Sequence, residues 1–306
     1  MSTATAGFEM RGKVNGSRPV KLDNILFATD FSPASEAALG YALAIARRYD
    51  SKLFVAHVIR PDLYQMLPPE NLAGVLEQIH HYAEQEMANL LISGRLRGIP
   101  HQILLEQGQL WPILSGMMEK NDIDLVVVGT RGRTGVQKLL LGSVAEEIFR
   151  LSRRPVLTVG PTVSGRPPEE TQLHEIVYAT DFTPAAERAA AYALSLAQEH
   201  QARLILLHVV RDVDKVSPEN VGRLREFFTK RLEKIVPPES DLWCDPEFAV
   251  SFGAPAEGIL EVAKSRHADL IVLGVRGVAS FAGHLPPATA YKIVCQALCP
   301  VLTVRD

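Results

Sequence analysis

The feature that most constrains the fold is an internal repeat that spans nearly the whole chain. Residues 24–59, NILFATDFSPASEAALGYALAIARRYDSKLFVAHVI, align without a gap with residues 175–210, EIVYATDFTPAAERAAAYALSLAQEHQARLILLHVV, at an offset of 151. Further on, DLVVVG at 124–129 matches DLIVLG at 269–274 at an offset of 145, so the second copy is shorter in between. This period lies far above that of solenoid repeats, and we interpret it as the duplication of a whole domain.

The repeat divides the chain into four parts. We expect a flexible N-terminal tail over 1–20, a first domain over 21–160, a linker over 161–172 and a second domain over 173–306. The linker is rich in proline, glycine and polar residues, a composition common at domain boundaries. The full length of 306 residues is sufficient for two ordinary domains.

Each copy alternates short β-rich runs with amphipathic segments. In the first copy we expect strands at NILFA, KLFVAHVI, HQILLEQ, DLVVVG and PVLTV, with four helices between them. This order predicts two tandem, doubly wound α/β domains of the Rossmann-like kind, each with a mostly parallel five-stranded sheet covered on both faces. Ser32 is expected to cap the first helix, with Pro33 as its first residue.

Composition and charge argue against several classes of protein. The net charge is -3, so no overall field favours nucleic acid or an anionic membrane. No apolar run approaches the ~20 residues of a membrane helix, and the tail lacks the apolar core of a secretory signal. The three cysteines are too few for a disulfide framework, which is typical of a reducing compartment. We expect a cytoplasmic protein with no nucleic-acid or membrane partner.

Ligands of open α/β sheets bind beyond the carboxyl ends of the strands, where the strand order reverses. In the first copy this rule selects the end of the first strand at Asp30, the end of the second at His57 and Val58, and the glycine-rich loop after the fourth strand. That loop reads GTRGRTGVQKLLLGSVAEE over 129–147.

The glycine-rich loop has the chemistry of an anion site. Gly129 and Gly132 allow a tight bend and a close approach to a ligand. Gly142-Ser143 opens the next helix, whose first amides and partial positive charge suit a phosphate. The hydroxyl of Ser143 is suited either to capping the helix or to binding a phosphate oxygen. Basic residues in the loop add positive charge: Arg131, Arg133 and Lys138.

Two common phosphate-binding motifs do not match. There is no Walker-type Gly-Lys-Ser/Thr, and the first strand is followed by ATDFSP rather than a glycine fingerprint. Instead, the spacing Gly129-x2-Gly132-x9-Gly142-Ser143, with ATDFSP and VAHVI at the first two strand ends, resembles the ATP-binding branch of the universal stress protein family. The resemblance covers almost the whole chain, twice. It implies a fold like the adenine nucleotide alpha hydrolases, pairing of domains, and bound ATP, with Mg²⁺ as a companion ion.

The resemblance also implies roles for individual residues. It places the end of the first strand beside the nucleotide, with Asp30 near the ribose or the Mg²⁺ ion, and the backbone of Val58 against the adenine. The residues expected around the whole ligand are Ala28, Thr29, Asp30, Val58, Gly129, Arg131, Gly132, Gly142, Ser143 and Val144.

Simpler interpretations stand beside these roles. Asp30 is also suited to fixing an Asx-turn before the helix, and Thr29 to a place in the same turn. His57 and its repeat His208 favour a buried, hydrogen-bonded histidine over a catalyst. Arg131 is also consistent with a solvated loop charge, and the loop glycines with tight turns alone.

The second copy departs from the pattern at the position of the Gly-Ser pair, which becomes Pro287-Ala288. Proline has no amide hydrogen to donate, and alanine has no hydroxyl. We therefore predict one full ATP site, in the first copy. Asp181 and Val209 remain and leave at most an adenine–ribose pocket in the second.

Three functions stay open on the sequence. The first is a stress or signalling protein in which ATP bound to the first domain modulates conformation and association. The second is slow ATP hydrolysis or autophosphorylation, for which no general base is evident. The third is a scaffold that binds no nucleotide. We expect the two fifth strands, both PVLTV, to pair in an intramolecular pseudo-dimer, and two chains to form a homodimer. Protein partners are unknown.

Overall fold

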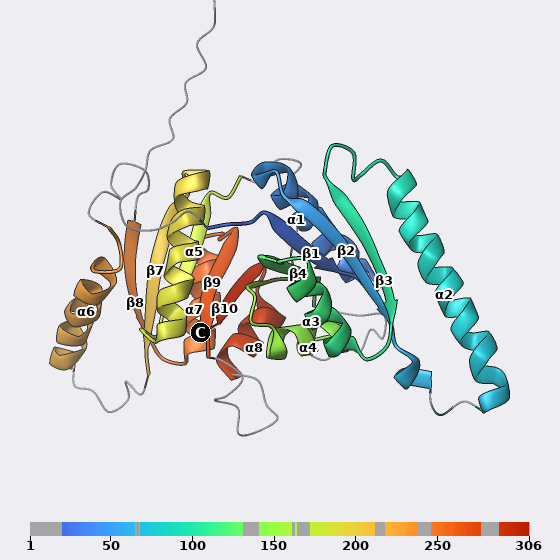
Figure 1. Ribbon diagram of the computed structural model, residues 1–306. Helices are drawn as coiled ribbons and strands as arrows, with labels where there is room; N and C mark the ends of the chain where they lie inside the picture. The colour runs from blue at the N-terminus through green and yellow to red at the C-terminus, as the bar shows by residue number, and fades with distance from the viewer. Residues whose placement is uncertain are drawn as a thin grey trace, which may run out of the picture.

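The computed structural model describes residues 20–64, 66, 68–130, 141–160, 163, 172–211, 218–237, 246–276 and 288–305. Strand and helix alternate through both copies, and the strands join one ten-stranded sheet (Figure 1). None of the helices in this part of the chain is both long and apolar enough to cross a lipid bilayer.

The first copy contains β1 (Asn24–Ala28), α1 (Pro33–Tyr49), β2 (Lys52–Ile59), the 3-10 helix η1 (Pro61–Tyr64), α2 (Pro69–Ile92), β3 (His101–Gln107), α3 (Leu110–Lys120), β4 (Leu125–Gly129), α4 (Ser143–Leu151) and β5 (Val156–Val159). The second contains β6 (Glu175–Ala179), α5 (Pro184–His200), β7 (Arg203–Val210), α6 (Pro218–Glu233), β8 (Pro246–Phe252), α7 (Pro255–Ser265), β9 (Leu270–Val275), α8 (Ala288–Gln296) and β10 (Val301–Arg305). The predicted alternation of five strands and four helices is confirmed in both copies.

The sheet has the strand order β3-β2-β1-β4-β5-β10-β9-β6-β7-β8. Pairing within each half is parallel, and the halves meet where β5 runs antiparallel to β10, with Leu157 opposite Leu302. The predicted pairing of the two fifth strands is therefore confirmed. In each half the order reverses beside the first strand, which places a crevice at the carboxyl ends of β1 and β4 or of β6 and β9.

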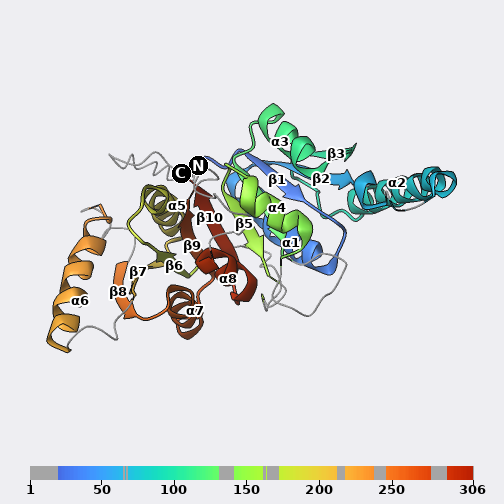
Figure 2. The same cartoon turned by 90° about the horizontal axis from the view of Figure 1, so that it is seen from below.

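Helices cover both faces of the sheet (Figure 2). Their side chains form two apolar cores, each continuous across both copies. One core contains side chains from α3, α4, α7 and α8, including Ile148 and Ile293, which are fully buried. The other contains side chains from α1, α2, α5 and α6, including Ala42 and Ala193. Since neither core stops at the β5–β10 seam, the copies pack as one unit.

The start of α1 fixes the geometry of the first crevice. Ser32 is the N-cap, its hydroxyl accepts a hydrogen bond from the amide of Ser35 at 3.2 Å, and Pro33 follows as the first helical residue. This confirms the predicted cap. Thr183 and Pro184 repeat the arrangement at α5, so both copies leave their first strand through the same capped turn.

Candidate functional site

One cavity gathers the predicted site residues of the first copy. It lies between the carboxyl ends of β1, β2 and β4, the start of α4, and side chains from η1 and α2. Eight of the ten predicted residues line it: Ala28, Thr29, Asp30, Val58, Gly129, Gly142, Ser143 and Val144. The other two, Arg131 and Gly132, lie outside the described residues.

Asp30 fixes the turn between β1 and α1. Its Oδ1 accepts hydrogen bonds from the amide of Ser32 at 3.0 Å and from the hydroxyl of Ser35 at 2.5 Å. In the second copy, Oδ1 of Asp181 accepts from the amide and hydroxyl of Thr183 at 3.1 and 2.6 Å. The Asx-turn interpretation is thus confirmed in both copies, and it places a carboxylate at the cavity wall.

Thr29 stabilises the same turn. Its hydroxyl accepts from the amide of Phe31 at 3.0 Å, which confirms the turn role considered from the sequence. Phe31 has a φ of 58°, in the left-handed region that a side chain other than glycine enters at a cost of ~1–3 kcal/mol. Thr180 and Phe182, with a φ of 60°, repeat this geometry.

His57 is held by a backbone hydrogen bond. Its Nδ1 donates to the carbonyl of Thr29 at 2.8 Å, and its ring packs on Phe31 with centroids 4.5 Å apart. His208 makes the matching bond to Thr180 at 2.8 Å, and burial lowers the pKa of His208. The predicted hydrogen bond is confirmed for both histidines, and both are half-buried rather than buried.

An aromatic wall completes the cavity, and we did not expect it from the sequence. Tyr82 on α2 contacts Phe31 nearly edge-on, with centroids 6.1 Å apart and planes at 83°. Ile79 from the same helix face and Arg60 after β2 also line the cavity. The helical spacing of the apolar residues in α2 indicates an inward face. It does not reveal that this face reaches the ends of β1 and β2.

The other end of the cavity is the start of α4. Gly142 is the N-cap, no side chain among the described residues caps the helix, and the amide of Gly142 donates to the carbonyl of Thr130 at 2.7 Å. Ser143 is the first helical residue, so the expectation that its hydroxyl caps the helix is wrong. Ser143 is exposed beside the cavity. The first-turn amides of Ser143 and Val144 therefore meet the cavity without a side-chain acceptor from the described part of the chain.

Gly129 is explained by packing rather than by a turn. It is the last residue of β4, and a Cβ atom there would lie 2.4 Å from the carbonyl oxygen of Ala34 in α1. Gly274 occupies the same place in β9, where a Cβ atom would lie 2.3 Å from the amide of Ala186. Both copies thus need glycine for the close approach of a helix to the strand end, whatever ligand binds.

The second copy also has a cavity at its strand ends, lined by Thr180, Asp181, His208, Val209, Gly274 and Arg276. Arg276 lies 4.0 Å from the carboxylate of Asp181, and the ring of Phe228 packs on His208 with centroids 4.2 Å apart. Pro287 lies outside the described residues, and nothing is described of the side chain of Ala288 at the start of α8.

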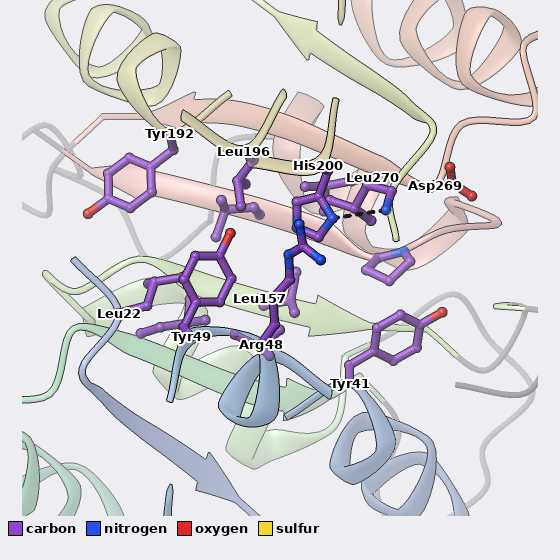
Figure 3. A pocket seen from close by; sticks show the side chains of 15 residues that line it. Leu22, Tyr41, Arg48, Tyr49, Leu157, Tyr192, Leu196, His200, Asp269 and Leu270 are labelled. Carbon is purple, nitrogen blue, oxygen red and sulfur yellow. Dashed lines mark hydrogen bonds between the residues drawn. The ribbon is translucent and has the colours of Figure 1, made fainter. Parts of the chain in front are cut away.

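A third cavity lies at the seam between the copies, on the face covered by α1 and α5 (Figure 3). Its lining is largely apolar, with Leu157 and Leu302 among the strand residues. The hydroxyl of Tyr49 is buried there and has no hydrogen-bond partner among the described residues, while Arg48 beside it donates to the carbonyl of Glu199 at 2.5 Å. His200 in the same lining accepts from the amide of Leu173 at 3.1 Å, so both basic side chains of the cavity hold backbone groups of the seam.

Comparison with known proteins agrees with the repeat. The sequence matches the universal stress protein family over residues 21–160 and again over 173–305. The chain belongs to the universal stress protein family. Its two matches make it a tandem member of that family.

Relatives span both the whole chain and single copies. A universal stress protein of Mycolicibacterium smegmatis is 27% identical over 298 residues, which cover 92% of this chain and 96% of the relative. A shorter universal stress protein of Thermus aquaticus is 35% identical over 144 residues, covering 42% of this chain and 97% of its own. The crystal structure of a universal stress protein from Archaeoglobus fulgidus has a TM-score of 0.67 at 20% identity, with 93% and 99% of the two chains covered, which shows a shared fold.

Among the described residues, no group of three or more His, Cys, Asp or Glu side chains is arranged to hold a metal ion. A Mg²⁺ ion that accompanies a nucleotide needs fewer ligands from the protein, because phosphates and water supply most of them. One carboxylate at the cavity wall meets that requirement, and Asp30 provides it.

Proposed function

We propose that the first copy binds ATP in its strand-end cavity, and that occupancy modulates the conformation and association of a stress or signalling protein. The observation that carries this proposal is the convergence of the eight described residues on one cavity. They come from four separate elements, and an uncapped helix N-terminus closes one end of the cavity.

The two ends of the cavity suit the two ends of ATP. Val58, Phe31 and Tyr82 offer apolar and aromatic surface to a flat base. At the other end, the first-turn amides of α4 and the hydroxyl of Ser143 suit phosphate oxygens, because a helix N-terminus carries a partial positive charge. Asp30 lies on the wall, where it suits a ribose hydroxyl or the Mg²⁺ ion that accompanies the phosphates. Arg131 and Gly132 are proposed to complete the phosphate site.

Binding fits the cavity better than turnover does. Asp30 and His57 are the described cavity residues with the chemistry of a general base, and both hold backbone turns through hydrogen bonds. A γ-phosphate at the start of α4 would meet a hydroxyl and amides there, which bind but do not activate water. We therefore expect any ATP hydrolysis or autophosphorylation to be slow.

Modulation requires that ATP bind one conformation better than another. The loop between Thr130 and Leu141 is the part of the site that nucleotide contacts would bias. We expect ATP to protect its basic residues, Arg131, Arg133 and Lys138, from trypsin. Unchanged cleavage with saturating ATP would remove support for this mechanism.

The proposed homodimer needs a surface other than the fifth strands. β5 and β10 pair with each other inside the chain, so these edges are not available to a second chain. The outer strands of the sheet, β3 and β8, and the helix faces remain as candidates. Measurement of molar mass in solution with and without ATP tests the homodimer and its dependence on nucleotide.

Ser143→Pro is the direct test of the site. Proline is favoured at the first helical position, so the change removes one amide hydrogen and one hydroxyl while preserving α4. We expect calorimetry to show ATP binding at least about tenfold weaker, since a hydrogen bond to a charged group contributes ~1.5–3 kcal/mol. AMP should be less affected, because it lacks the outer phosphates.

Ala288→Pro is the matched control, because Ala288 is the first residue of α8 in the second copy. We expect this variant to bind ATP like the unmodified chain. Equal ATP affinity in Ser143→Pro and the unmodified chain would contradict the site. Absence of ATP binding by the unmodified chain would favour a scaffold without nucleotide.

A further inference from the structure

The second copy supplies one contact to the proposed phosphate end of the first. The amide of Leu141, directly before the Gly142-Ser143 pair, donates a hydrogen bond to the hydroxyl of Tyr291 at 3.2 Å. Tyr291 belongs to the first turns of α8, 150 positions further along the chain. The next amide, that of Gly142, donates to the carbonyl of Thr130 at 2.7 Å. Two consecutive amides thus fix the backbone where it enters α4.

Tyr291 is itself held in place. Its ring packs edge-on against Phe149 of α4, with centroids 6.4 Å apart and planes at 68°. The ring also packs against the core formed by α3, α4, α7 and α8. From β10, the guanidinium of Arg305 donates to the carbonyl of Phe149. The second copy therefore contacts α4 near both its ends, at Leu141 and at Phe149.

The sequence of the second copy does not allow the same contact in the reverse direction. At the offset of 145 that relates this part of the two copies, Tyr291 corresponds to Glu146 and Leu141 corresponds to Pro286. A proline has no amide hydrogen, so Pro286 cannot donate to the first copy the hydrogen bond that Leu141 donates to Tyr291. The copy that lost the Gly-Ser pair is thus the one that supplies the hydroxyl.

We propose that Tyr291 is a positioning residue for the nucleotide site of the first copy, which makes the second copy part of that site's support. Its hydroxyl fixes Leu141, and through it the direction in which α4 presents the amide and hydroxyl of Ser143 to the cavity. The inference rests on the proposed nucleotide function. It adds that movement of α8 changes the affinity of the first copy for the phosphates of ATP, because α8 carries the hydroxyl.

Tyr291→Phe removes the hydroxyl and leaves the ring on Phe149. We expect ATP to bind about fivefold more weakly, the fold-change of one typical hydrogen bond, and adenosine to bind as it does to the unmodified chain. Hydrogen exchange without nucleotide should show a faster-exchanging Leu141 amide in the variant. Tyr192→Phe is the matched control, because Tyr192 is a half-buried tyrosine on α5, at the opposite face of the sheet, and should change none of these values.

The outcomes separate this inference from the proposed function. ATP binding by the unmodified chain tests the proposed function, and its absence overturns both. When the unmodified chain binds ATP, equal affinity in Tyr291→Phe overturns the inference alone. An equal loss for ATP and adenosine also overturns it, because that pattern reports a general disturbance of the fold. An unchanged exchange rate at Leu141 shows that the hydroxyl does not hold this amide, and it too overturns the inference.

Discussion

At the scale of single residues, Gly129 and Gly274 show how a strand end accommodates a helix. A methyl group at either would lie within 2.4 Å of helix backbone. We expect Gly129→Ala and Gly274→Ala each to lower the free energy of unfolding by ~1–3 kcal/mol, the usual cost of overpacking. Gly116→Ala in α3 is the control, since nothing lies within 4 Å of its added methyl group and alanine favours helix. Chemical denaturation measures the free energy of unfolding of all three variants. A Gly129→Ala variant as stable as the unmodified chain would contradict the packing explanation.

His200 at the seam predicts how stability depends on pH. The side chain is only 4% exposed, and its Nδ1 accepts from the amide of Leu173 at 3.1 Å. Burial, followed by the nearby Arg48 and His174, lowers its pKa from 6.5 to about 4. Between these values the unfolded chain binds a proton that the folded chain does not. The contribution of neutral His200 to the free energy of unfolding is therefore fully present above pH 6.5. It decreases as the pH falls towards 4, by at most ~1.4 kcal/mol per pH unit.

Denaturation series at several pH values test this dependence. We expect His200→Gln to flatten the decline between pH 6.5 and 4, because the amide cannot take up the proton. His174→Gln, which replaces an exposed histidine of the same region, should leave most of the decline in place. A decline of the same slope in His200→Gln and the unmodified chain would show that other groups cause it.

At the scale of elements, the turn from the first strand into its helix was predictable in detail. Ser32 and Pro33 carry the local signals of a helix start, and the turn chemistry of Asp30 depends on neighbours in the sequence. The start of α4 was predictable only in part. The sequence placed Gly142-Ser143 there, but it did not show that Gly142 takes the cap position and uses its own amide to hold Thr130. That bond depends on where a long loop returns, which local patterns do not specify.

Asp30 and Asp181 allow the structural and ligand roles of this turn to be separated. Each accepts two short-range hydrogen bonds through Oδ1, so we expect Asp30→Ala and Asp181→Ala both to lose ~1–2 kcal/mol of stability. If Asp30 also contacts nucleotide or Mg²⁺, Asp30→Ala alone should weaken ATP binding. Thermal unfolding and calorimetry on both variants provide the comparison. Equal ATP affinity in the two would assign Asp30 to the turn only.

At the scale of the whole molecule, the copies should unfold together. Both apolar cores cross the seam, and β5 and β10 share a ladder at the centre of the sheet. We expect one calorimetric transition for the unmodified chain. Leu302 is 4% exposed in that ladder, and Leu302→Ala should lower the free energy of unfolding by ~2–5 kcal/mol while unfolding still occurs in one transition. Two separate transitions in the unmodified chain would show that the copies are thermodynamically independent.

Duplication made the architecture the most predictable part of this protein. The fifth strand of each copy has an apolar edge that would otherwise be exposed. Because both copies carry the same PVLTV strand, β5 and β10 cover each other's edge by pairing. Contacts between elements that lie far apart in the chain could not be predicted from the pattern. Tyr82 at the cavity and Tyr291 beside Leu141 both depend on how elements distant in the chain pack in space.

The central claim is the contrast between the two copies, and the number of ATP molecules bound per chain tests it most directly. Equilibrium dialysis of the full chain with saturating ATP and Mg²⁺ measures this number, with Ser143→Pro and Ala288→Pro in parallel. We predict one ATP per chain, greatly weakened by Ser143→Pro and unchanged by Ala288→Pro. Two equivalent sites per chain, or one site that responds to Ala288→Pro but not to Ser143→Pro, would contradict the account.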